Sequence, residues 1–522
     1  MMMLFDPEAY PLTPGAAGPV LAAGEERRPL KLRTAQREQS WMIPVIVDKL
    51  VDEDHEVRAI WEYVGQMELG RLYAGIKTSQ GASGRAAIDP RTLAAVWMYG
   101  LSKGVNSARE LERRCQWEPA YQWLTGMRGV NYHPLSDFRT DNEAWLAEAF
   151  VEVVGLLRQA GLVTLERVMI DGTKVRANAG GDSYRSEETL ERHLTEARQH
   201  WQEVLAVGPE ENERRLQSRR ERAAAERVAQ LEQARQELAK RRQSAHSRED
   251  AAKMRVSETD PDSRVMKSGD GGYRPSYNVQ VATDEQAGVI VGVRTVQSAS
   301  DAAELVPDLE AVRAQAGQLP AQTVVDGGFT NRPSVVAVTA LGVDLIGSMT
   351  DGAARGEREL EKRKVGREFW PDRFVYDQEK DAYRCPCEKT VKYRSTEIRD
   401  EATRKKYEAS ASDCQACGHR QECCPGAKQK GRSLTRIEEP PEVEVFRAKM
   451  ATEEAKAIYR RRGPVAEFSN LCLKTRNGLK EFRLRGLRKV GLEALWAGLV
   501  HNLMVWVRLC WRNRQRSECA QT

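Results

Sequence analysis

The sequence lacks three features that would assign it to a simple class of protein. Its first 30 residues have no basic stretch followed by an apolar run, so we expect no signal peptide. Its most apolar stretch, residues 492–510, is interrupted by Glu493 and Arg508, which favours a buried helix over a membrane span. Its net charge is only +5 over 522 residues, so total charge defines no partner. With 41% hydrophobic residues, it is neither wholly disordered nor built from membrane spans, and we expect a cytoplasmic protein.

Changes in composition divide the chain into several segments. Helical spacing of apolar residues is followed by short β-branched runs that alternate with helices, which indicates a mixed α/β core. Two of these runs, 277–283 and 289–296, predict a hairpin, and a helix is predicted from about 453 to 474 that begins or restarts at Gly463-Pro464. Two insertions interrupt that core, one charged and helix-favouring, the other polar and rich in cysteine. The predicted segments are a disordered arm at 1–40, a helical N-terminal domain at 41–160, a core at 161–350 and 452–511, a helical or coiled-coil insertion at 186–250, a cysteine-rich insertion at 351–451 and a tail at 512–522.

Two helical regions have more than one interpretation. In the N-terminal segment, where Asp89-Pro90 predicts a helix start, three arginines interrupt one helix face. Both a helix-turn-helix DNA reader and an ordinary bundle would show this pattern. In the first insertion, two apolar stripes separated by Gly208-Pro209 predict a helical hairpin or short coiled coil. The stripes are Leu190, Leu194, Trp201 and Leu205, and then Val228, Leu231 and Leu238; the three arginines are Arg109, Arg113 and Arg114.

Two acidic residues follow short apolar runs. Asp171 ends the run 168–170, Asp326 ends the run 323–325, and glycine follows each of them. Strand ends are where α/β sheets present functional groups, and glycine would keep the chain clear of a ligand. Carboxylates from neighbouring strands, with one from a helix, can hold two Mg²⁺ ions that clamp a phosphodiester. Asp260, Asp262, Asp270, Asp301 and Glu304 form a second acidic set, which we keep as alternative metal ligands although its first members predict a turn.

The third carboxylate is supplied by residues 459–474. There Tyr459, Arg462, Glu467 and Lys474 resemble the Tyr-x-x-Arg, Glu-x6-Lys signature of bacterial insertion-sequence transposases of the DDE type. In this chain four residues separate the Arg and the Glu, where many relatives have three. Other segments are also similar to that family: 170–174 and 325–329 to its first two Asp motifs, and 277–280, 484–487 and 501–503 to further conserved-looking stretches.

The resemblance implies a fold, a reaction and partners. It implies an RNase H-like core in which Asp171, Asp326 and Glu467 bind two Mg²⁺ ions. Metal-activated water would cut the ends of the element, and the freed 3′-hydroxyl would attack target DNA. The partner would be double-stranded DNA, at the transposon ends and at the target, with a homodimer bound to it. Residues suited to phosphate contact are Tyr459, Arg462 and Lys474, with Lys480, Arg483 and Arg485 in the basic stretch that follows.

The cysteine-rich insertion suggests a second metal. Cys-x-x-Cys spacing lets two thiolates reach one tetrahedral Zn²⁺ from a tight turn, and four thiolates would make a structural site. A reduced, metal-free loop is the alternative. The candidate ligands are Cys385, Cys387, Cys414, Cys417 and Cys423 or Cys424, with His419 as a further alternative.

Two other functions remain open. The RNase H-like core also serves Mg²⁺-dependent nucleases, so the fold alone does not select transposition. A non-catalytic, DNA-binding domesticated relative would keep the helical domain and the zinc site. The 459–474 signature favours the transposase.

Overall fold

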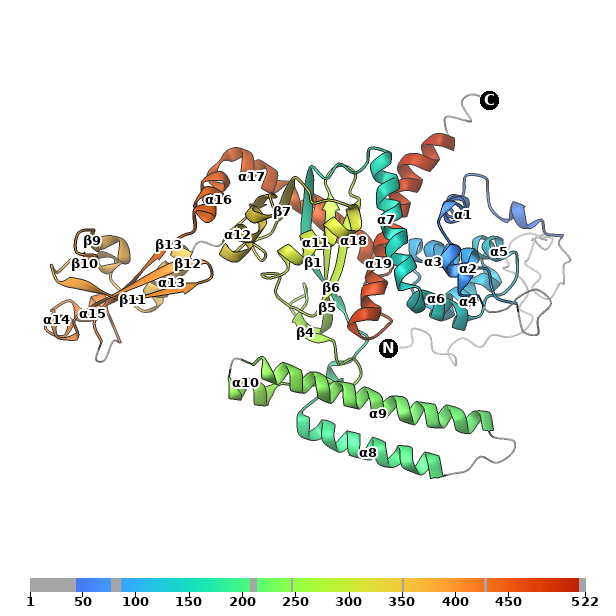
Figure 1. Ribbon diagram of the computed structural model, residues 1–522, viewed down its shortest axis with the longest axis horizontal. Coiled ribbons are helices and arrows are strands. Elements are labelled where there is room, and N and C mark those ends of the chain that lie inside the picture. Colours follow the sequence, from blue (N-terminus) through green and yellow to red (C-terminus); the bar gives the residue numbers. More distant parts are fainter. Residues whose placement is uncertain are drawn as a thin grey trace, which may run out of the picture. The chain divides into compact units, whose positions relative to one another are not determined.

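A computed structural model describes residues 44–76, 86–206, 214–245, 247–349, 352–426 and 430–515 (Figure 1). The predicted disordered arm at 1–40 and residues 516–522 of the predicted tail lie outside the described residues. The account below concerns the unit from Val47 onward.

Seven helices form the N-terminal part of this unit. Asp89 caps α3 by accepting a hydrogen bond from the Arg91 amide, and Pro90 occupies the first helical position, as the sequence predicts. Gly126 ends α5 in the left-handed conformation that glycine adopts without a steric penalty. The helices are α1 (Glu56–Gln66), α2 (Gly70–Ala74), α3 (Pro90–Ser102), α4 (Ala108–Trp117), α5 (Pro119–Thr125), α6 (Tyr132–Asp141) and α7 (Glu143–Gln159).

A six-stranded mixed sheet follows, which confirms the predicted α/β class. Its order is β4-β5-β1-β7-β8, with β6 also paired to β5. β5 is antiparallel to β1, β4 and β6, and the β5–β6 hairpin is the one predicted from two β-branched runs. β7 is parallel to β1 and to β8. The strands are β1 (Arg167–Arg176), β4 (Arg264–Lys267), β5 (Tyr273–Asp284), β6 (Ile290–Val296), β7 (Gln322–Val325) and β8 (Asp344–Gly347).

β1 is longer than the sequence predicts. We expected it to end at Asp171-Gly172, but it continues to Arg176. The strand continues because β5 pairs with β1 from Val168 through Arg176. Thr173 and Val175 are buried and alternate with more exposed residues, as expected for a strand with one buried face. Parallel pairing with β7 stops at Ile170, so the other edge of β1 is left without a strand partner from Asp171 to Val175.

Helices cover both faces of the sheet. Val312 and Asp308 of α11 (Leu305–Ala316) face β6, and α12 (Arg332–Ala340) packs on β8 and α11. The opposite face is covered by α17 (Glu453–Arg460), α18 (Arg462–Thr475) and α19 (Leu487–Trp506). The sequence predicted a helix from about 453 to 474 that begins or restarts at Gly463-Pro464. In the structure the division falls at Arg461, which caps both helices, and Gly463 and Pro464 lie in the first turn of α18.

The buried helix predicted at residues 492–510 is confirmed. The stretch Leu487–Gln515 is apolar and long enough to cross a membrane, but 83% of its most apolar window is buried inside the fold. One hydrophobic cluster runs from Val51 to Trp511, so the N-terminal helices, the sheet and α19 share a core. Within it, Arg139 of α6 pairs with Glu493 of α19 at 2.5 Å, and both side chains are almost fully buried.

The first insertion is a helical hairpin, as predicted. α8 (Glu187–Ala206) packs along α9 (Arg214–Gln243), with α10 (Arg248–Lys253) after it (Figure 1). The predicted stripes meet in one cluster, except that Leu205 is 54% exposed and lies outside it. A short ribbon of β2 (Tyr184–Arg185) and β3 (Val256–Ser257) joins the two ends of the insertion.

The cysteine-rich insertion contains its own antiparallel sheet. The strand order is β13-β12-β11-β10-β9, and its hydrophobic cluster has five buried members: Phe374, Val391, Tyr407, Ala409 and Leu434. Its elements are α13 (Gly352–Lys362), β9 (Val375–Asp377), β10 (Ala382–Arg384), β11 (Thr390–Arg399), β12 (Ala402–Ala409), α14 (Ala411–Gln415), α15 (Arg420–Cys423), β13 (Ser433–Glu438) and α16 (Pro441–Ala451).

Candidate active site at the edge of the sheet

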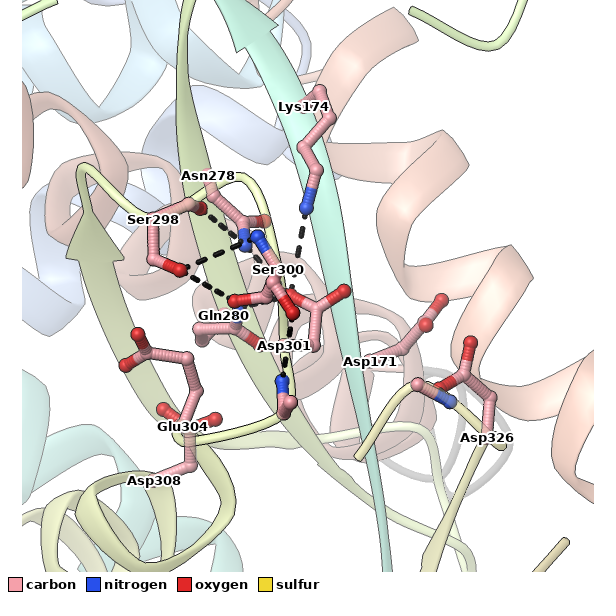
Figure 2. A network of polar contacts seen from close by, with 12 residues as sticks. Asp171, Lys174, Asn278, Gln280, Ser298, Ser300, Asp301, Glu304, Asp308 and Asp326 are labelled. Atoms are coloured by element: carbon pink, nitrogen blue, oxygen red, sulfur yellow. Dashed lines mark hydrogen bonds and ion pairs between the residues drawn. The ribbon is translucent and has the colours of Figure 1, made fainter. Parts of the chain in front are cut away.

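Asp171 and Asp326 lie side by side. Met169 and Ile170 of β1 are in register with Val324 and Val325 of β7, so the two aspartates occupy equivalent positions just beyond the parallel pairing. Figure 2 shows both carboxylates at this edge of the sheet. By the alternation of β1, Asp171 belongs to the face that carries Met169, which packs with α17 and α18.

The surroundings of Asp171 combine opposing electrostatic effects. Burial raises its pKa to about 6, the negative charges of Asp326 and Asp301 act in the same direction, and Arg462 opposes them. Arg462 lies 3.7 Å from Asp171 Oδ1, and Asn470 Nδ2 donates a hydrogen bond to Oδ2 at 2.9 Å. A crowded, partly desolvated carboxylate pair of this kind is suited to a divalent cation, because a bound positive charge relieves the repulsion.

α18 brings the predicted signature to the same place. The Arg462 guanidinium lies over the Tyr459 ring, 5.9 Å from its centroid. Burial lowers the pKa of Lys474, and the positive charge of Lys174 acts in the same direction. The negative charge of Asp171 opposes both effects, so Lys474 interacts electrostatically with the aspartate. Asn470 was missed in the sequence; the available signal was one amide among the apolar residues of 465–473.

Glu467 takes a different position from the two aspartates. It is exposed on α18, one turn before Asn470, and its carboxylate lies near Gly463. Within the described ranges, no group of three or more His, Cys, Asp or Glu side chains is arranged to hold a metal. The structure therefore brings together Asp171, Asp326, Arg462 and Lys474, with Glu467 on the adjacent turn.

The basic residues predicted to contact DNA after α18, which are Lys480, Arg483 and Arg485, are all exposed. Hydrogen bonds to other parts of the chain hold two of them in place. The Arg483 backbone amide donates to Glu493, and its Nε donates to Asn106 Oδ1 at 3.3 Å. Arg485 Nε donates to the Asn178 carbonyl at 3.1 Å, and Lys480 is exposed in the turn before them.

The second acidic set is mainly structural. Asp260 Oδ1 accepts hydrogen bonds from the Tyr277 hydroxyl and the Gly486 amide, and Asp262 accepts one from the Leu487 amide. These two carboxylates therefore cap the N-terminus of α19, where negative charge is favourable. Asp270 is exposed in a turn and pairs with Arg274. Glu304 pairs with Arg294, away from the two aspartates. Asp301 pairs with Lys174, three residues after Asp171 on β1, at 3.4 Å.

The cysteines of the second insertion converge on one small cavity. All six line a space of about 30 Å³, the size of a single small ion or water, but the described thiols are not arranged as a group of three or more that could hold a metal. Two of the thiols accept backbone hydrogen bonds at 3.3 Å, Cys385 from Lys389 and Cys414 from Arg432. Burial raises the pKa of Cys387 to about 11, and the nearby Cys417 and Cys385 contribute. His419 pairs with Glu422 at 3.0 Å.

In the mixed sheet β1, β4 and β6 are antiparallel to β5, and β7 and β8 continue parallel to β1. This arrangement, with a carboxylate pair where the two parts meet, is that of an RNase H-like core. Two family models match the sequence: a transposase DDE domain at residues 384–507 and a transposase domain at residues 45–141. These two regions are therefore similar to transposase domains, and the C-terminal one is similar to the DDE type. The family implies a metal-dependent, DNA-cleaving enzyme. Searches of curated proteins and of solved structures found no match.

The matched regions cover only part of the candidate site. The DDE match contains Glu467, Lys474 and all six clustered cysteines, whereas Asp171 and Asp326 precede it. The assignment of the two aspartates therefore depends on the strand register and on their shared surroundings.

Proposed function

We propose that this protein binds the ends of its insertion sequence, cleaves them in a metal-dependent reaction and joins the freed 3′-hydroxyl to target DNA. The observation that carries the proposal is the pairing of Asp171 and Asp326 at neighbouring strand ends, with Arg462 and Lys474 beside them. Two carboxylates with two cationic side chains suit a phosphodiester that must be held while charge develops on its oxygens.

The chain's own residues have distinct parts in this proposal. Asp171, Asp326 and Glu467 would hold two Mg²⁺ ions, which when bound supply charge stabilisation for the attacking and leaving oxygens. Asn470 and Arg462 fix the orientation of the Asp171 carboxylate. Because Glu467 lies on the next turn of the same helix, rotation of its side chain would suffice to redirect it towards the pair.

DNA would be held by the basic residues around this edge. Arg462 and Tyr459 are stacked, Lys474 is near Asp171, and Lys480, Arg483 and Arg485 continue the basic surface. Because both ends of an element must be brought together, we propose a homodimer on double-stranded DNA. Its place of action would be the cytoplasm, on the nucleoid.

Cleavage of DNA carrying the element's ends tests this function. With Mg²⁺, wild-type protein should cut it, and Asp326→Ala should reduce cleavage by at least about 10³-fold while DNA binding persists. Asp344→Ala is the matched control, because Asp344 is exposed at the opposite end of β8 and pairs with Lys449. Equal cleavage by wild type and Asp326→Ala would refute the assignment. If both proteins bind the DNA and neither cleaves it, the non-catalytic relative is favoured. If the wild type cleaves the DNA but does not join it to a target, the nuclease is favoured.

We further propose one structural Zn²⁺ in the insertion, held by four of the clustered thiols. The support is that the cysteines share one ion-sized cavity and that two of them accept backbone amide hydrogen bonds. Elemental analysis of protein purified without chelator and under reducing conditions should give one zinc per chain. Absence of zinc in such a preparation would remove the proposal.

A further inference from the structure

Asp301 occupies the space that glycine leaves beside Asp171. It stands in the turn before α11, and its carboxylate lies against β1 (Figure 2). A Cβ atom at Gly172 would lie 2.6 Å from Asp301 Oδ1, closer than atoms can approach. From the sequence we expected this glycine to make room for a ligand; the structure gives that room to Asp301.

Buried amides fix the Asp301 carboxylate. Its Oδ1 accepts hydrogen bonds from Asn278 Nδ2 at 2.6 Å and Gln280 Nε2 at 2.7 Å. Both amide side chains come from β5 and are almost fully buried, 0% and 1% exposed. Hydrogen bonds to a charged acceptor are strong, so Asp301 is held by the packed interior and has little freedom to follow solvent. This also explains two of the polar residues in the 277–280 segment, which resembled the family.

The remaining partner of Asp301 is Lys174. The Lys174 ammonium lies 3.4 Å from the same Oδ1, and both side chains are 19% exposed. Lys174 stands on the part of β1 that has no strand partner on the β7 side, three residues after Asp171. The charges of Lys174 and Asp171 both affect the pKa of Lys474, so the three groups interact electrostatically.

A free lysine here would be attracted to the carboxylates of the site. An ammonium paired with Asp171 or Asp326 would compete there with a bound cation. Asp301 gives Lys174 a separate partner on the other face of β1. The ammonium is thereby kept at the uncovered edge of the strand, where a DNA strand running past Asp171 would meet it.

We propose that Asp301 is a positioning residue that holds Lys174 at this edge, so that Lys174 contacts a phosphate of the bound DNA. The inference rests on the proposed function for the site and identifies two residues that the transposase signature does not include. Asp301 would act through Lys174, and this dependence separates it from a metal ligand.

A double-mutant cycle tests the dependence. Asp301→Asn removes the charge but keeps an oxygen for Asn278 and Gln280, and Lys174→Gln removes the ammonium. Each variant should lower cleavage in Mg²⁺ by roughly ten- to a hundredfold. If Asp301 acts through Lys174, the double variant should cleave no more slowly than Lys174→Gln alone. If Asp301→Asn still costs tenfold or more in the Lys174→Gln background, Asp301 acts independently and the proposal is overturned.

A binding measurement separates this inference from the proposed function. Lys174→Gln should reduce the slope of log affinity against log salt concentration by about one, the value for one lost phosphate contact. An unchanged slope would overturn the contact even if the wild type cleaves normally. Failure of the wild type to cleave would count against the proposed function, while the slope would still report on Lys174. Glu304→Gln is the matched control, because Glu304 is three residues away and pairs with Arg294; it should change neither readout. Equal melting temperatures would exclude misfolding.

Discussion

The acidic site and the cysteine cluster differ in what holds their side chains in place. Asp171 and Asp326 come from neighbouring strands whose register is fixed within a cluster that spans Val51 to Trp511. The cysteines come from the short helices α14 and α15 and from the turns around a sheet whose own cluster has five buried members. A large hydrophobic core can hold metal ligands in position without a bound ion, whereas a core this small needs a cross-link such as a metal ion to be stable. The comparison predicts that the acidic site needs no metal for its fold, whereas the insertion would depend on the zinc proposed above.

Removing the proposed zinc should have the largest effect, and it should affect the insertion alone. Structural zinc sites contribute on the order of 10 kcal/mol to the folding of small domains, far more than the insertion's own core can supply. A chelator under reducing conditions should therefore expose the amides of β11, β12 and β13 to hydrogen exchange, while β1 and β5 stay protected. Unchanged exchange in the insertion would contradict the comparison.

The next prediction concerns a buried ion pair in the large hydrophobic core. Arg139 and Glu493 form a buried ion pair, and Glu493 also accepts from the Arg483 and Leu484 amides. Glu493→Gln should lower the free energy of unfolding by about 3–5 kcal/mol, since it leaves a buried charge unpaired. Urea denaturation measures the loss, and Glu143→Gln in the exposed pair with Arg488 should cost less than about 1 kcal/mol. Equal losses in the two variants would argue that the buried pair has no special weight.

A smaller substitution probes the precision of the acidic site. Gly172→Ala would drive a methyl group into the Asp301 carboxylate and the buried Asn278 and Gln280 side chains. We expect a loss of about 1–3 kcal/mol in stability, together with slower DNA cleavage. Gly181→Ala is the control, since nothing lies within 4 Å of its added Cβ. If thermal unfolding and cleavage are the same for both variants, the close packing at Gly172 is unimportant.

The smallest effect concerns pH. Burial raises the pKa of Asp308 to about 7 from its ordinary value of 3.8, despite the opposing charge of Arg294. At a pH between these two pKa values, Asp308 keeps its proton in the folded chain and has lost it in the unfolded chain. The free energy of unfolding therefore decreases as the pH rises through this range. Asp308→Asn should flatten this decline in urea denaturation at pH 5 and pH 8. Asp344→Asn should leave the decline in place.

Much of the fold was predictable because its signals are local. Asp89-Pro90, the β5–β6 hairpin and the buried helix at 492–510 each depend on a few neighbouring residues. The full length of β1 was not predictable, because it is set by pairing with β5, more than a hundred residues away. The break at Arg461 was only partly visible through Gly463-Pro464.

The candidate site divides in the same way. Asp171 and Asp326 were visible because each follows a short apolar run and precedes glycine. Asn470 and Asp301 were not, because their parts depend on contacts across the sheet. Asp260 and Asp262 were predicted to lie in a turn and were kept only as alternative ligands, yet they cap α19, whose position no local pattern could reveal.

The ribbon of β2 and β3 gives the helical hairpin the character of a replaceable module. Tyr184 and Arg185 pair with Ser257 and Val256, so the chain leaves and rejoins the core at neighbouring points. A two-residue turn could connect those points without shifting the register of β1 or β5. Over evolutionary time such a junction lets a lineage lengthen, shorten or exchange the helical hairpin while the candidate site stays the same, so relatives are expected to differ more in this hairpin than in the sheet.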